Sequence, residues 1–301
     1  MTHSHNHSTN RTRLLWALGI TASIVAVQLI GALLTGSLAL FADAGHMFSD
    51  VFGLTIALAA TVIAAKPPTE RATFGYQRSE VFGAAINGTI LLVVAVVVGV
   101  TAVIRLLAPV EVEVPGLPLL IFAAIGLLAN VAAALILRPA RGSSINMRGA
   151  YLEVLGDMLG SAAAIVAGLV ILLTGFQQAD AIASIAIAAL IAPRAFVLLK
   201  ESARVLLQSV PVETSVAEIR DHILGNEGVV DVHDVHVWSI TTGQRVFSAH
   251  VVVDPAVFVE ERTGKLLDEL SECLADHFDV EHSTFQLEPA EHAEHEGHVH
   301  A

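Results

Sequence analysis

The sequence predicts a polytopic α-helical membrane protein with six transmembrane helices, followed by a soluble α+β domain. Hydrophobic residues make up 54% of the 301 residues and charged residues only 15%, far from the composition of a soluble globular domain. Six apolar runs lie before residue 201, and each is long enough to cross a bilayer. The surplus of acidic over basic residues lies entirely after that point, where 20 acidic residues stand against 5 Lys or Arg.

Turn-forming or polar breaks separate the six runs. Lys66-Pro67-Pro68, for example, divides the second run from the third. The first run follows a polar, His-rich start and is too long for the apolar part of a signal peptide, so we interpret it as a membrane helix. The predicted membrane helices are 14–34, 38–64, 80–108, 117–137, 149–174 and 179–200.

Basic residues lie on alternate connections between these helices. The connections 35–37, 109–116 and 175–178 contain no Lys or Arg, whereas the N-terminal segment, the other connections and the end of the sixth helix do. The positive-inside rule then places both termini in the cytoplasm, with Arg105 as the exception. The second and fifth helices are therefore expected to run antiparallel.

Ionisable residues interrupt two of the apolar runs. His46 and Asp50 lie four residues apart in the second run, as do Glu153 and Asp157 in the fifth. This spacing places each pair on one helix face, and a charge at the bilayer centre costs about 3 kcal/mol or more. In antiparallel helices His46 lies level with Asp157 and Asp50 with Glu153, which gives four N and O ligands for one cation. The alternative is that these groups only tie the helices together.

Three other polar residues lie in the runs. Asp43 shares a face with Asp50, and it either lines the approach to the site or caps the start of the helix. Gln28 and Asn130 are expected to hydrogen-bond across helices.

The tail after residue 209 predicts a small domain of order αββαβ. Ser215 and Glu218 have the spacing of a capping box for a helix that ends near Leu224. Alternating Val-rich stretches at 229–240 and 246–254 flank a hairpin loop. A helical pattern at 259–277 and a strand at 283–287 complete a layer of helices on a sheet.

The composition of the tail limits its partners. Its acidic surplus would be repelled by phosphates, so nucleic acid is not an expected partner. Cys273 is the only cysteine, which excludes an intrachain disulfide and a Cys-rich metal site.

Histidines supply candidate ligands in the tail. If the hairpin centres between residues 242 and 243, His250 faces Val235 and shares a sheet face with His233. A slip of one residue would pair His250 with His236 instead. The alternative is that these are exposed polar residues without a ligand. Both chain ends are also His-rich, a composition typical of loose metal binding: His3, His5, His7, His292, His295, His298 and His300.

Four segments resemble the motifs of the cation diffusion facilitator family. They are Asp43-Ala-Gly-His-Met-Phe-Ser-Asp50, Gly75-Tyr-Gln-Arg-Ser-Glu80, the stretch 146–160 and Val232-His-Asp-Val-His-Val-Trp238. The resemblance covers about residues 14–289. It implies a homodimeric divalent-metal/proton antiporter in the lipid bilayer, and we expect the bacterial inner (plasma) membrane.

The resemblance also implies domains and sites. It implies a six-helix domain at 14–209 and a ferredoxin-like cytoplasmic domain at 210–289, for metal sensing and dimerisation. His-rich tails at 1–13 and 290–301 flank them. The transport site would be His46, Asp50, Glu153 and Asp157, and a regulatory site would use His233, His250 and Glu288.

Two positions depart from the family pattern. Zinc members usually have His where this chain has Glu153, and a carboxylate makes the site harder, which admits cadmium, cobalt, iron or manganese. His46 argues against a site for manganese alone. Gln77 stands where many members have His, so no metal site is expected in that loop.

The expected function is export of Zn²⁺ in exchange for protons, with Zn²⁺ also as a regulator of the tail. Two alternatives from other classes are a passive divalent-cation channel and a membrane-anchored metal sensor. No nucleophile–base pair or phosphate-binding loop indicates an enzyme.

Overall fold

The computed structural model describes residues 4–64, 66–107, 112–138, 145–241, 243–259, 261–280 and 282–293. The side chains of 4–15, 17, 54, 57, 58, 61, 64 and 145–150 are outside this description, so most of the terminal histidines are as well. The chain forms two compact units, 1–59 with 83–199 and 60–82 with 200–301. Each unit is described by itself below.

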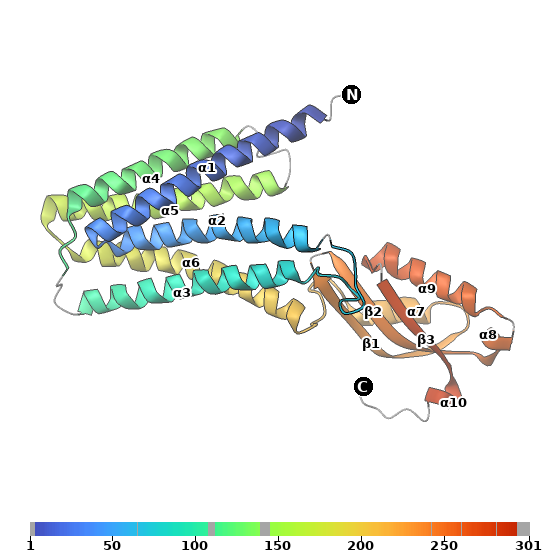
Figure 1. Ribbon diagram of the computed structural model, residues 1–301. Coiled ribbons are helices and arrows are strands. Elements are labelled where there is room, and N and C mark those ends of the chain that lie inside the picture. Colours follow the sequence, from blue (N-terminus) through green and yellow to red (C-terminus); the bar gives the residue numbers. More distant parts are fainter. Residues whose placement is uncertain are drawn as a thin grey trace. The chain divides into compact units, whose positions relative to one another are not determined.

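Long helices form the first unit and match the six predicted apolar runs closely (Figure 1). The largest differences are that α1 begins ten residues before the predicted start and α6 extends to residue 206. The helices are α1 Ser4–Thr35, α2 Leu38–Ala64, α3 Ser79–Leu107, α4 Gly116–Leu137, α5 Ile145–Thr174 and α6 Gln178–Leu206.

Five of these helices are long and apolar enough to cross a membrane, as judged on the described residues. Helix α2 is not among the five, so the prediction of six membrane spans is confirmed only for the others. The five spans are Leu18–Thr35, Ser79–Leu107, Gly116–Leu137, Tyr151–Thr174 and Gln178–Leu206.

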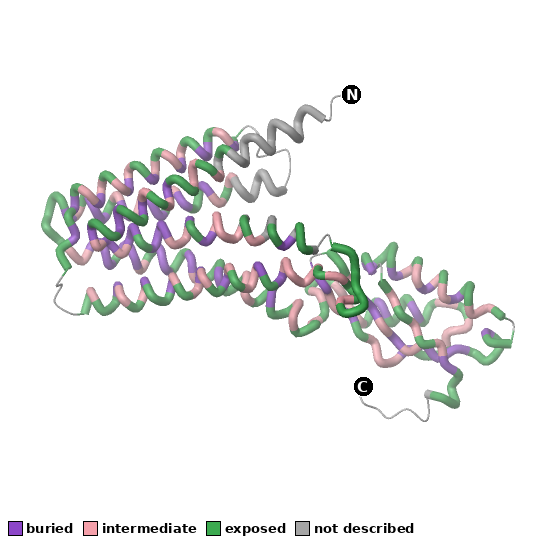
Figure 2. The backbone as a smooth tube through the Cα atoms, viewed as in Figure 1, coloured by how far each residue is buried: buried purple, intermediate pink, exposed green. Residues whose placement is uncertain are grey.

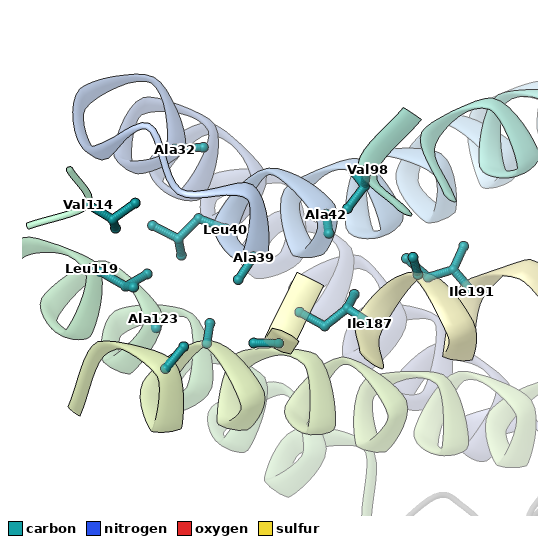
Figure 3. Close-up of a cluster of buried hydrophobic side chains, with 14 of the residues drawn as sticks. Ala32, Ala39, Leu40, Ala42, Val98, Val114, Leu119, Ala123, Ile187 and Ile191 are labelled. Atoms are coloured by element: carbon teal, nitrogen blue, oxygen red, sulfur yellow. The ribbon is translucent and has the colours of Figure 1, made fainter. Parts of the chain in front are cut away.

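Small side chains bring the helices together. The buried cluster in Figure 3 is rich in alanine, including Ala32, Ala39, Ala42 and Ala123, as expected where membrane helices approach closely. Helices α4 and α5 touch through their backbones, since a Cβ on Gly116 would lie 2.7 Å from the backbone nitrogen of Leu172. The outward faces of the helices are exposed in Figure 2 and include many large apolar residues, a surface suited to lipid.

A carboxylate from α6 holds the N-terminus of α2. Asp180 Oδ2 accepts a hydrogen bond from the backbone N–H of Leu38 at 2.9 Å, and Oδ1 accepts one from the Ser37 hydroxyl at 2.5 Å. Such an acceptor satisfies N–H groups that have no partner within the helix. Arg105 Nη1 lies 3.7 Å from Asp180 Oδ2 and donates to the Gly36 carbonyl. Arg105, the exception to the charge pattern of the loops, is thus the counterion of a buried acid.

The second unit contains a three-stranded sheet of order β1-β2-β3. Strands β1 and β2 form an antiparallel hairpin, and β3 returns parallel to β2 after α9 (Figure 1). The elements are α7 Val216–Leu224, β1 Val229–Thr241, β2 Gln244–Val253, α8 Pro255–Val259, α9 Thr263–Phe278, β3 His282–Pro289 and α10 Ala290–Ala293. The predicted order αββαβ is confirmed, with α8 and α10 as short additions.

The core of this unit lies between the sheet and the apolar faces of α7 and α9. Ile219 and Ile223 of α7, Leu270 and Leu274 of α9 and Phe247 of β2 are all fully buried. At the start of α7 the Ser215 hydroxyl accepts a hydrogen bond from the backbone N–H of Glu218 at 3.2 Å. This is the helix cap that the sequence predicts.

The register of the hairpin differs from the expected one. His250 pairs directly with His233, and neither Val235 nor His236 is its partner. The register shifts between Ser239 and Thr241 and again between His233 and His236. Asp234 lies within the second shift with φ of +50°, a conformation typical of a bulge that re-aims a side chain. The predicted pairing of His250 with Val235 was therefore wrong, whereas the predicted shared face of His250 and His233 is confirmed.

Replacing Asp180 tests how α2 is held. Asp180→Ala leaves the Ser37 hydroxyl, two backbone N–H groups and Arg105 without their acceptor, so we expect a loss of about 2 kcal/mol or more. The thermal unfolding midpoint of the purified protein should fall clearly, while Glu113→Gln at an exposed acid should leave it unchanged. An unchanged midpoint in Asp180→Ala would show that α2 is held by other contacts.

Candidate metal centres

Two neighbouring helices bring three predicted ligands together inside the first unit. His46 Nε2 lies 3.5 Å from Asp157 Oδ1 and 3.8 Å from Asp50 Oδ2. Ligand atoms of these three residues all lie within 4.8 Å of one another. Bonds of about 2.0 to 2.1 Å in a tetrahedral zinc site separate ligand atoms by roughly 3.4 Å, so little movement is needed to hold an ion.

The three side chains are poorly solvated and incompletely paired. Asp157 is 2% exposed, and the side chains of Asp50 and His46 are 10% and 13% exposed. In the described structure, Asp157 Oδ1 and both carboxylate oxygens of Asp50 are buried without a hydrogen-bond donor. Buried acceptors without donors are costly, and a bound cation would satisfy them.

The fourth predicted ligand has a different neighbour. Glu153 Oε1 forms an ion pair with Nη2 of Arg194, and the same nitrogen lies 3.4 Å from Asp50 Oδ1. Arg194 follows Pro193 within α6. In the sequence, Arg194 counts among the basic residues at the end of the sixth helix, and the charge pattern does not reveal this contact. The proline, which breaks the helix ladder at that point, was the available signal.

Asp43 lies in a separate buried polar cluster. Its Oδ2 accepts hydrogen bonds from Gln28 Nε2 at 2.7 Å and from the Ser161 hydroxyl at 2.9 Å. A Cβ at Gly160 would overlap the other carboxylate oxygen, so glycine makes room for the acid there. Asp43 thus ties α1 and α5 to α2, and the start of α2 is capped by Asp180 instead. The prediction of a hydrogen bond from Gln28 to another helix is confirmed.

The hydrogen bond across helices that the sequence predicts for Asn130 is not found in the described part of the chain. Asn130 is fully buried on α4, but neither its amide oxygen nor its nitrogen has a hydrogen-bond partner among the described residues. Its predicted bond across helices is not present in this structure.

The second unit gathers ligands from all three strands. Glu288 on β3 is 2% exposed, with Oε1 2.5 Å from His233 Nε2 and Oε2 3.7 Å from His250 Nδ1. The ring centroids of the two histidines are 5.2 Å apart. The bulge at Asp234 creates this arrangement because it sets His233 directly opposite His250. His292, on α10, lies near the same carboxylate, with Nε2 3.8 Å from Oε2.

One other candidate of the tail, His236, lies apart from this group. His236 pairs with the neighbouring Asp234, Nε2 to Oδ1 at 3.1 Å. Burial and the nearby Asp276 raise the pKa of the Cys273 thiol, which favours its protonated form at neutral pH.

Comparison with known proteins identifies the family of this chain. Residues 14–207 match the family described as "Cation efflux transmembrane domain". Residues 211–290 match the family described as "Cation efflux protein, cytoplasmic domain". The chain belongs to the cation diffusion facilitator family of metal efflux transporters. It is therefore an integral membrane protein that moves divalent metal ions out, and its family is one of transporters rather than enzymes.

Similar proteins match over nearly their whole length. The metal cation efflux system protein CzcD of Cupriavidus metallidurans is 39% identical over 99% of this chain and 94% of its own. The cadmium, cobalt and zinc/H(+)-K(+) antiporter of Bacillus subtilis is 36% identical over 97% of this chain and 93% of its own. The zinc transporter ZitB of Escherichia coli is 39% identical over 96% of this chain and 93% of its own.

Counting bound zinc tests the site in the second unit. His250→Ala removes one of three clustered ligands, so we expect the purified full-length protein to bind one Zn²⁺ ion fewer per chain. His222→Ala is the matched control, since this histidine contacts His277 instead, and it should leave the count unchanged. Equal zinc content in His250→Ala and the parent would contradict the site.

Proposed function

We propose that this protein exports Zn²⁺ from the cytoplasm in exchange for protons. The observation that carries the proposal is the buried group of His46 Nε2, Asp50 Oδ2 and Asp157 Oδ1 among apolar helices. One imidazole with carboxylates is a typical zinc ligand set. Cobalt and iron are further candidate substrates because carboxylates make the site harder, and cadmium is another because a relative is named as an antiporter of cadmium, cobalt and zinc.

Competition between protons and metal supports the exchange. The same nitrogen and oxygen atoms bind either a proton or a metal ion, so metal binding releases protons and protonation releases metal. A site that opens alternately to each side would therefore couple the two flows. The relatives are consistent with such an exchange, since one is named an antiporter of cadmium, cobalt and zinc and another a zinc transporter.

The membrane arrangement is part of the proposal. We propose that α2 crosses the bilayer together with the five other helices, with both termini in the cytoplasm of a bacterial inner membrane. The domains would be the tail 1–13, the helical part 14–209, a ferredoxin-like domain 210–289 and the tail 290–301. Pairing of two copies through residues 211–290 would form a homodimer, in line with the family description of that region.

We also propose a regulatory role for the group of His233, His250 and Glu288. The region from residue 201 carries 20 acidic and 5 basic residues, so two copies repel one another. Divalent cations held at Glu288 would reduce that repulsion and favour association of the two copies. The coupling must be reciprocal, so association would also tighten metal binding.

Two other functions predict different behaviour of the zinc flux and of the ligand residues. A passive channel binds its ion weakly enough for fast exit, so its zinc flux would not need a proton counterflow. A membrane-anchored sensor would need the ligands on β1, β2 and β3 but not those on α2 and α5. The buried ligands in the helical unit favour transport over sensing.

Zinc-driven proton flux in reconstituted vesicles tests the function. Asp157→Asn keeps the size of the side chain but removes its charge at the most buried ligand, so we expect at least about a hundredfold loss of zinc flux, the scale of a lost buried charge interaction. Glu113→Gln, at an exposed acid outside the site, should transport like the parent. Parental zinc flux in Asp157→Asn at equal protein levels would exclude this site, and zinc flux without proton counterflow would favour a channel.

A further inference from the structure

Arg194 places a positive charge beside a site that would bind a cation. It extends from α6 and contacts carboxylates of two other helices, Glu153 of α5 and Asp50 of α2. An arginine so close to a metal site can act in two ways. It either repels the metal ion or neutralises one carboxylate charge beyond the two that a divalent cation neutralises. The positions of the surrounding oxygens distinguish these two roles.

The two oxygens of Asp50 face different partners. Oδ2 lies 3.8 Å from His46 Nε2, whereas Oδ1 lies 3.4 Å from Arg194 Nη2. A metal ion bound through Oδ2 would therefore leave the contact with Arg194 intact. The ion pair would then orient the second oxygen of the ligating carboxylate, as groups around a metal site commonly do.

Glu153 is placed differently from the other acids. Its Oε1 is held by Arg194, and its side chain is 35% exposed against 10% for Asp50 and 2% for Asp157. The compact group of ligand atoms found among the described residues contains His46, Asp50 and Asp157 but not Glu153. In this structure Glu153 therefore lies outside the group of three ligands and beside Arg194.

Formal charge agrees with this arrangement. Asp50, Asp157 and Glu153 supply three negative charges and Arg194 one positive charge, so the site with neutral His46 has a net charge of −2. A divalent cation neutralises that charge. Without Arg194 the loaded site would keep a negative charge among apolar helices, which is costly.

We propose that Glu153 and Arg194 act as a neutral pair that positions Asp50, while His46, Asp50 and Asp157 hold the metal directly. This inference rests on the proposed function, because it concerns the same site. Three protein ligands leave one coordination position open for water, as in zinc sites whose bound species must exchange. Arg194 is a positioning residue, and it keeps an anionic fourth ligand away from the ion.

Cobalt(II) absorption and affinity of the full-length protein test the pair. The measurement uses a His233→Ala/His250→Ala background, so that the signal comes from the helical unit. Glu153→Gln leaves Asp50 as the carboxylate that pairs with Arg194. We therefore expect about tenfold weaker cobalt binding, within the range of coupling between contacting residues. Arg194→Gln releases Glu153 toward the ion and should tighten binding about tenfold and change the spectrum.

The double variant Glu153→Gln/Arg194→Gln separates the alternatives. If the two residues act as a neutral pair, its affinity returns to within about threefold of the parent, since the single effects cancel. Its absorption spectrum should also match the parent, because the direct ligands are the same. If Glu153 is a direct ligand, the double variant stays at least about tenfold weaker and its spectrum changes, which would overturn the proposal.

Two further variants keep the result interpretable. Arg194→Lys retains the charge and should bind cobalt like the parent, and a tenfold change there would contradict a charge-balancing role. Glu153→Gln alone gives a second test of the pair. Its cobalt spectrum should keep the parental shape despite weaker binding, and an altered shape would also overturn the proposal.

Asp157→Asn tests the transport site itself and should lose the cobalt signal. A parental signal there would reject the transport site itself, whereas its loss together with an altered double variant rejects only the neutral pair.

Discussion

The cost of placing charge among apolar helices is the constraint on which this structure depends. Most of the buried acids of the helical unit are satisfied by donors or a cation from another helix. Asp180 has Ser37, the α2 backbone and Arg105, Asp43 has Gln28 and Ser161, and Glu153 has Arg194. Four carboxylate oxygens among the described residues are buried without a hydrogen-bond donor, namely Asp43 Oδ1, both oxygens of Asp50 and Asp157 Oδ1. Of these, Asp50 Oδ2 and Asp157 Oδ1 both lie beside His46 Nε2. Two carboxylate oxygens without donors that converge on one imidazole nitrogen indicate a place for a cation.

The same interactions position the ligands. Asp180 fixes the start of α2, and less than two turns later Asp43 ties α2 to α1 and α5. His46 and Asp50 follow on the next two turns, so their approach to α5 is set before any metal binds. Alanine and glycine at the helix contacts permit this close packing. Preorganised ligands on rigid helices hold an ion with little rearrangement, and the open side of such a site suits exchange rather than permanent binding.

Much of this architecture could be predicted from the sequence. Long apolar runs and their polar breaks indicated the helices, and the four-residue spacing of His46 and Asp50 with Glu153 and Asp157 indicated faces that meet. Three features could not be predicted. Arg194 lies near the end of the predicted sixth helix and fits the charge pattern of a cytoplasmic helix end, and only the tertiary structure shows that it reaches Glu153. Asp180 caps a helix that lies far from it in the sequence. The register of the hairpin depends on the left-handed conformation of Asp234, which an alternating pattern does not reveal.

The location of bound zinc tests the central claim most directly. A crystal structure of the zinc-loaded full-length protein, with data recorded at the zinc absorption edge, would show the ion by its anomalous signal. The account predicts a peak about 2 Å from His46 Nε2, Asp50 Oδ2 and Asp157 Oδ1, with Glu153 still paired to Arg194. Zinc found only beside Glu288, with none between α2 and α5, would contradict it.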